Sequence, residues 1–179
     1  MTLSTIADIS QIVSVPIAVI SIYISAYLVI KQLINSRNNS IKEFNIRRKE
    51  ITLNAYNSIR DILRDISNKI KADLGINDIF GIINQEQIQK IIHNTELENK
   101  IRKMLGIYER FAVGVKHNIY CLDMIYDISG TVFISTFNQF KPYIDYVRKK
   151  ENRPYIKEFE VLVAKLESKR NENNNINKS

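Results

Sequence analysis

The stretch KQLINSRNNSIKEFNIRRKEITLNAYNSIRDILRDISNKIK, residues 31–71, contains neither proline nor glycine. Apolar residues recur along it at intervals of three, four or seven positions, which places them on one face of a helix. The stretch therefore predicts one long helix. The residues of this face are Ile34, Ile41, Phe44, Ile51, Ala55, Ile59, Ile62, Ile66 and Ile70.

The same stretch carries most of the positive charge of the chain. Residues 31–72 hold ten Lys and Arg against four Asp and Glu, while the whole chain of 179 residues has a net charge of +7. An excess of this kind indicates an anionic partner, either a lipid surface or nucleic acid. A nucleic-acid site usually adds aromatic platforms, which are missing here, so lipid is the simpler interpretation. The residues expected to make this contact are Arg37, Lys42, Arg47, Arg48 and Lys49.

An uncharged and mostly apolar run, residues 9–30, precedes the long helix. A helix needs about 20 such residues to cross a bilayer, so the run predicts a transmembrane helix that continues into the basic helix at 31–73. A cleaved signal peptide and a buried core helix are the alternatives. Because the basic residues follow the run, we expect residues 1–8 on the extracytoplasmic side of the inner membrane and the residues after the span in the cytosol.

Small and polar residues form a stripe along this run. In a membrane, small residues allow helices to approach closely and hydroxyl groups to bond across the contact, so the stripe predicts a homo-oligomer and allows for a pore. Alternatively, each serine hydroxyl bonds only to the carbonyl four residues before it. The oligomer or pore face expected from the stripe consists of Gln11, Ser14, Ala18, Ser21 and Ser25, with Gln32 beyond the run.

The rest of the chain shows helical periodicity and no convincing strand pattern, so the fold class is expected to be all-α with a small antiparallel bundle. Turn-forming residues interrupt the pattern at 74–83, and Thr95 with Glu98 matches a capping box. Lys141 and Pro142 predict a helix end. The predicted segments of this cytosolic domain, 74–169, are helices at 85–93, 96–118, 122–140 and 154–169, followed by a disordered tail at 170–179.

Arg110 and His117 are the candidate catalytic residues. They are separated by about two helical turns and would therefore lie on one face of the predicted helix 96–118, whose other face would bury Ala112, Val115 and Ile119. In a ribonuclease, histidine would move the proton of the RNA 2′-hydroxyl and arginine would hold the phosphate. A structural arginine paired with a carboxylate is the alternative.

No other pattern indicates a catalytic site, and neither a metal nor a cofactor is expected. His93 lies among apolar residues and reads as structural, and Cys121 lacks partners at zinc-ligand spacing. The pair of Asp123 and Asp127 is spaced to bind a cation, although such pairs usually form a solvated face.

The block LGIYERFAVGVKHNIYCLDMIYDISGTVFISTFNQFKPYIDYVRKK, residues 105–150, resembles part of an uncharacterised family of small bacterial membrane proteins. The resemblance implies an N-terminal span and a helical domain of unknown function. Asn118 departs from the usual glycine of that family and Cys121 from its usual aspartate. The resemblance is carried by Glu109 to Val115, Ile119, Tyr120, Asp123, Gly130, Pro142, Tyr143, Ile144 and Arg148.

The overall plan also resembles the small membrane accessory protein of type VI-B CRISPR systems, which has a HEPN-like helical domain with an Arg–His motif. That resemblance implies an oligomeric pore acting in antiphage defence beside a partner protein. We therefore expect a self-assembling membrane effector. The alternatives are a membrane-tethered HEPN-like ribonuclease and a membrane-bound adaptor without activity of its own.

Overall fold

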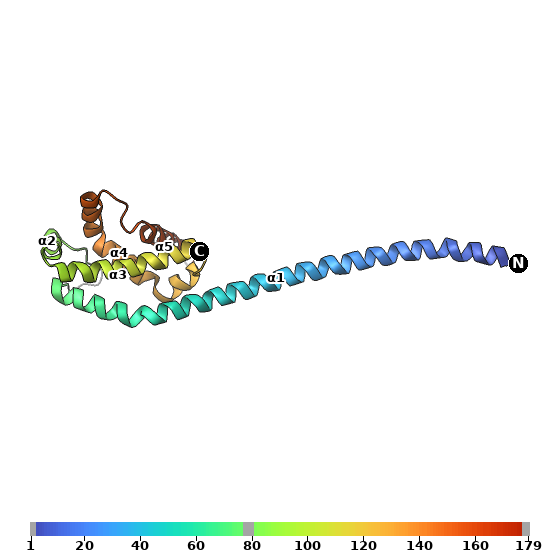
Figure 1. The fold of residues 1–179 in the computed structure, drawn as a ribbon, viewed down its shortest axis with the longest axis horizontal. Coiled ribbons are helices and arrows are strands. Elements are labelled where there is room, and N and C mark those ends of the chain that lie inside the picture. The colour runs from blue at the N-terminus through green and yellow to red at the C-terminus, as the bar shows by residue number, and fades with distance from the viewer. Residues whose placement is uncertain (1–2, 77–80, 177–179) are drawn as a thin grey trace. The chain divides into compact units, whose positions relative to one another are not determined.

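The computed structural model describes residues 3–76 and 81–176, except for the side chains of residues 3–20, Ile22 and Ile176. All regular elements in these ranges are helices, which confirms the all-α class (Figure 1). Their bounds are α1 Leu3–Leu74, α2 Gln85–His93, α3 Thr95–Lys116, α4 Leu122–Glu151 and α5 Lys157–Ile176. The chain divides into two compact units, Met1–Ile46 and Arg47–Ser179.

Among the described residues, no helix is both long enough and apolar enough to cross a membrane. This finding contradicts the transmembrane helix predicted at 9–30, and with it the single-pass inner-membrane localisation. The described side chains of α1 begin at Ser21, and the charges of Lys31 and Arg37 interrupt the apolar residues soon after. The uncharged stretch of described side chains before Lys31 is therefore shorter than the roughly 20 residues that a span requires. The earlier part of the predicted span lies outside the described side chains.

The second unit has a core to which the last part of α1 contributes one face. Leu63, Ile66, Ile70 and Leu74 are buried there, as the spacing of three or four residues requires of a helix face. Ile66 and Ile70 were predicted on this face. The earlier members of the predicted helix face, Ile34, Ile41, Phe44 and Ile51, are exposed.

Aromatic rings fill the centre of this core. Tyr108 stacks on Phe159 with ring centroids 4.9 Å apart and meets Phe133 edge-on at 4.7 Å. Phe137 packs against Phe159 at 5.4 Å. Since these rings come from α3, α4 and α5, they join three helices in one core. Burial also raises the pKa of Tyr108 to about 12.

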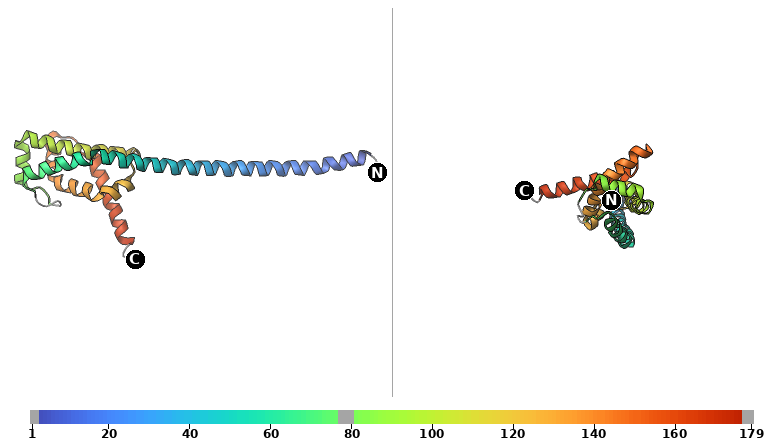
Figure 2. Two further views of the ribbon diagram at one scale, coloured as in Figure 1. Left: turned by 90° about the horizontal axis from the view of Figure 1, so that it is seen from below. Right: turned by 90° about the vertical axis from the view of Figure 1, so that its left-hand side faces the viewer.

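Ion pairs show how the helices of the second unit run. Lys100 on α3 lies 3.4 Å from Asp73 at the end of α1, so α3 returns antiparallel to α1 (Figure 1; Figure 2, left). Arg102 likewise pairs with Glu151 at 2.8 Å, which brings the end of α4 back to the start of α3. This arrangement is the predicted antiparallel bundle.

The start of α5 is capped from another helix. Its preceding residue, Ile156, has no polar side chain, and the carboxylate of Glu109 on α3 takes its place. One oxygen accepts the backbone N–H of Glu158 at 3.1 Å and the other that of Phe159 at 2.7 Å. An anion at this position satisfies otherwise orphan donors and interacts favourably with the helix dipole.

Several predicted helix boundaries need correction. The cap of α3 is Asn94, whose side chain accepts the N–H of Leu97 at 3.0 Å, and not Thr95. Helix α4 continues through Pro142, because Tyr143 and Ile144 beyond it are fully buried, and its non-helical residue is Ser129. Helix α5 runs into the segment that was predicted to be disordered.

Candidate functional site

The described part of the first unit presents an apolar face along α1. Tyr23, Tyr27, Ile30 and Ile34 follow one another at alternating intervals of four and three residues, and Ile41 and Phe44 continue the same register after Arg37. This is the seven-residue repeat by which helices pair in coiled coils. We call these six apolar residues the α1 seam.

The α1 seam is exposed throughout. The exposed fraction is 80% for Tyr23, 54% for Ile34 and 58% for Phe44. Ile24, Leu28, Val29 and Leu33 are also largely exposed and widen the apolar surface beyond the seam. Isolated exposed apolar residues are common, but a contiguous apolar surface of this kind marks an interaction site.

The predicted oligomer face is only partly described. The side chains of Gln11, Ser14 and Ala18 lie outside the described residues. Ser21 and Ser25 are exposed, and the Ser25 hydroxyl donates to the Ser21 carbonyl at 2.7 Å. This is the bond within one helix that was considered as the alternative.

The basic residues predicted to contact lipid or nucleic acid lie along α1. Arg37 and Lys42 belong to the first unit and Arg47, Arg48 and Lys49 to the second. All are exposed except Arg48, which is half-buried. Arg48 and Lys49 act electrostatically on Asp123 and contribute to lowering its pKa. Their contact with an external anion stays a prediction.

Arg110 and His117 are both exposed, but they do not lie on one helix as predicted. Helix α3 ends at Lys116, so His117 is its C-cap and Asn118 adopts a left-handed conformation with φ of 57°. The helix ends here because the Gly114 carbonyl accepts the N–H groups of Ile119 and Tyr120, at 2.9 and 3.1 Å. Consequently Ile119 is exposed, whereas Ala112 and Val115 face the core as expected.

The remaining candidates have structural surroundings. His93 Nδ1 lies 2.8 Å from the Gln89 carbonyl on its own helix, and Cys121 is buried. Asp123 forms an ion pair with Lys169 of α5, which lowers the pKa of Asp123 and raises that of Lys169. The Asp123 carboxylate is therefore already paired with a lysine. Within the described residues, no cluster of His, Cys, Asp and Glu is arranged to bind a metal.

A polar cluster between α3 and α4 was not predicted. The Arg102 guanidinium donates to Glu98 at 2.9 Å and to Glu151 at 2.8 Å, and the Tyr143 hydroxyl donates to Glu98 at 3.0 Å. Burial alone would lower the pKa of Arg102, but these carboxylates outweigh it and raise the pKa. Burial raises the pKa of neighbouring Tyr155 to about 12. The spacing of Glu98 and Arg102 is the only signal of this cluster in the sequence.

Comparison with known proteins assigns the chain to a family. A family model described as "Domain of unknown function (DUF4760)" matches residues 9–166. The chain belongs to the DUF4760 family. No curated protein and no solved structure matches it.

Membership of DUF4760 confirms the expectation of an uncharacterised family, and the match extends well beyond the block at 105–150. The likeness to the type VI-B accessory protein and to HEPN domains stays a prediction. Two residues that carried the family resemblance have clear structural roles. Glu109 caps α5, and Arg148 donates to the Tyr155 carbonyl at 2.9 Å and to Glu160 at 2.9 Å, which fixes the loop between α4 and α5.

Proposed function

We propose that this DUF4760 chain is a self-assembling scaffold whose copies associate through the α1 seam. The observation that carries the proposal is the exposure of a seven-residue apolar repeat along the described part of α1. Burial of such side chains releases about 25 cal/mol for each Å² of apolar surface, so they provide a driving force for association. A second copy of α1 is the occupant that a heptad seam fits, because the seam is complementary to itself.

The residues beside the central part of the seam are compatible with parallel pairing. In a parallel pair, each seam is flanked by contacts between residues five positions apart on the two helices. In the seam's central part these contacts join Leu33 to Asn38 and Ser40 to Asn45, none of which is charged. The basic residues Lys42 and Lys49 lie away from the seam, where neighbouring copies do not bring them together.

Arg37 is the one charged residue at a seam position between Tyr23 and Phe44. In a parallel assembly Arg37 of each chain meets Arg37 of its neighbours. This costs free energy but fixes the register of the paired helices, as a single polar residue in a seam does. The additional apolar surface at Ile24, Leu28 and Val29 would remain uncovered in a pair of helices. We therefore propose an assembly of more than two chains.

The proposal is tested by changing the seam in the full-length chain. Ile34 and Ile41 are replaced together by aspartate, and the matched control replaces the outward Ser36 and Asn39 in the same way. Light scattering after size exclusion should show that the seam variant is monomeric while the control keeps the mass of the wild type. The same mass for both variants would contradict the proposal. Arg37→Leu should strengthen association, because it removes the like-charge layer.

A membrane-independent ribonuclease activity is a second proposal, supported by the exposure of both Arg110 and His117. It is tested by incubating the full chain with labelled single-stranded RNA. Cleavage that is lost in His117→Ala but kept in His93→Ala would support it. Cleavage that survives in His117→Ala, or no cleavage by the wild type, would reject it. A role in antiphage defence beside a partner protein stays a prediction.

A further inference from the structure

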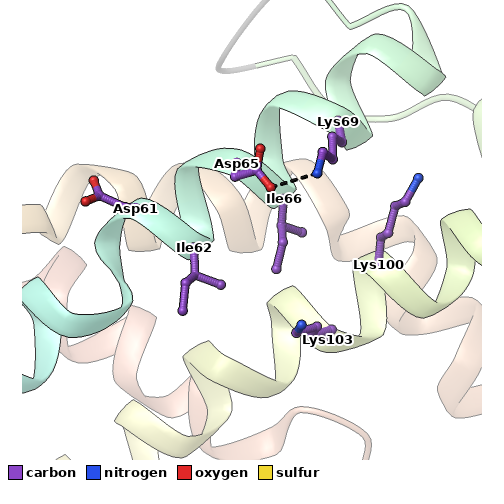
Figure 3. A pocket seen from close by; sticks show the side chains of 7 residues that line it. All are labelled: Asp61, Ile62, Asp65, Ile66, Lys69, Lys100 and Lys103. Carbon is purple, nitrogen blue, oxygen red and sulfur yellow. Dashed lines mark hydrogen bonds and ion pairs between the residues drawn. The ribbon is translucent and has the colours of Figure 1, made fainter.

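A groove runs between α1 and α3 in the second unit. It consists of two adjoining cavities of about 440 and about 360 Å³, which share Ile62 and Lys103 in their linings. The first cavity extends to Lys69 and Lys100, and the second to Ala55 and Arg110. Figure 3 shows Ile62 and Ile66 projecting from α1 towards α3, which carries Lys100 and Lys103. We call this feature the α1–α3 groove.

The floor of the α1–α3 groove is apolar. Ile62 and Ile66 line the first cavity, and Ile59, Ile107 and Phe111 line the second. Ile62 is 48% exposed although it points between two helices of the bundle. An apolar floor along a groove of this kind binds the apolar face of another helix in many complexes.

The two walls of the α1–α3 groove differ in charge. On the α1 wall, Asp65 is paired with Lys69 at 2.8 Å, as Figure 3 shows, and Asp61 with Arg64 at 3.1 Å. The acidic groups of this wall are therefore neutralised by neighbours on the same helix. They leave little net charge for a ligand on that side.

The α3 wall carries two cations without partners. Among the described residues, neither Lys103 nor Arg110 has a hydrogen bond or an ion pair, and the cavity that both line has no carboxylate in its lining. The two residues are seven positions apart, so their charges repeat after about 10 Å along the groove. Lys100, further along the same wall, is already paired with Glu96 at 2.8 Å.

We propose that the α1–α3 groove binds an acidic amphipathic helix of another protein. Its apolar residues would lie on the isoleucine floor, and two acidic residues one heptad apart would pair with Lys103 and Arg110. From Ala55 to Lys69 the α1 wall is about 21 Å long, which matches about four turns of a docked helix. The pairing gives this surface specificity for a partner with acidic residues on one side.

The charges and their spacing favour an acidic helix over two other occupants. The exposed apolar part of α1 in a second copy carries Arg37, Lys42 and Arg47, which the basic α3 wall would repel. A lipid has a single headgroup, whereas Lys103 and Arg110 are spaced along the groove and not gathered at one end. An acidic helix matches both cations at once.

The test uses two labelled helical peptides of about five turns each, with leucines on one face. One has two glutamates seven residues apart beside the leucines, and the other has lysines at these positions. Fluorescence anisotropy measures their affinity for the full-length chain and for the variant Lys103→Glu/Arg110→Glu. The matched control is Lys149→Glu/Arg170→Glu, which changes two exposed cations outside the groove.

We expect the glutamate peptide to bind the wild type and the control equally, and to bind the groove variant roughly tenfold more weakly or worse. The lysine peptide should show the reverse preference. Ile62→Asp should abolish binding, with circular dichroism showing that the half-exposed site tolerates the change. Equal binding by both peptides, or no binding of the glutamate peptide, would overturn the proposal. Binding of the wild type to phosphatidylglycerol vesicles through Lys103 and Arg110, without peptide binding, would overturn it in favour of lipid.

Discussion

Replacing Glu109 by alanine should destabilise the second unit by releasing the start of α5. The two carboxylate oxygens accept the N–H groups of Glu158 and Phe159, and no polar side chain at Ile156 can take over. Phe159 is fully buried, so fraying of the first turn also disturbs its stacking on Tyr108.

The size of the effect follows from these two bonds. Loss of a helix N-cap costs about 0.5–2 kcal/mol, and a single hydrogen bond to a charged group contributes about 1.5–3 kcal/mol. Because the site of Glu109 is only half-buried and water can replace part of the interaction, we expect a loss of about 2 kcal/mol. In a chain of this size, such a loss lowers Tm by roughly 4–8 °C.

The assay is thermal unfolding followed by circular dichroism, at one fixed protein concentration because association affects Tm. Glu167→Ala on α5 is the control, since it removes a half-buried carboxylate that caps no helix. Glu109→Gln keeps one acceptor oxygen and should fall between the wild type and Glu109→Ala. A Tm for Glu109→Ala equal to that of Glu167→Ala would refute the capping role.

Two further predictions concern packing and pH. Gly114→Ala should lower the free energy of unfolding, measured with denaturant, by about 1–3 kcal/mol, because the new methyl group overlaps the Tyr120 ring. Gly106→Ala meets no atom within 4 Å and should raise the free energy of unfolding by up to about 1 kcal/mol. Equal effects of the two substitutions would contradict this. The pKa of Asp123 is lowered, mainly by its hydrogen bond with Lys169. The ionised carboxylate therefore stabilises the fold at pH values above the ordinary aspartate pKa, and this stabilisation is lost as the pH falls through the lowered pKa. Asp123→Asn should remove that acid dependence, worth under about 1 kcal/mol at this exposed site, and an unchanged pH profile would contradict the pairing.

Helix periodicity predicted most of the bundle because its apolar residues do face one core. Ala112 and Val115 were expected on the inner face of α3 and are both buried. The helix end predicted at Pro142 was wrong, since a preference of a single residue is outweighed when large side chains on both sides are buried. Sequence alone does not report that balance.

The site was harder to predict than the fold. The repeat that includes Ile34 and Ile41 was recognised as one helix face, but periodicity does not show what covers a face, and both residues are exposed in the chain. The spacing of Arg110 and His117 was interpreted on one continuous helix, but the helix ends at Lys116 and is followed by a turn at Asn118. Glu109 capping a distant helix leaves no local signal, since its partners are about 50 residues away.

Cysteine crosslinking tests the central claim, association through the α1 seam, most directly. In a Cys121→Ser background, single cysteines are placed at the seam positions Ile34 and Ile41 and at the outward positions Ser36 and Asn39. Treatment of intact cells with a short bismaleimide should link chains at 34 and 41 and leave 36 and 39 unlinked. Equal crosslinking at all four positions, or crosslinking only at 36 and 39, would contradict the assignment of the seam.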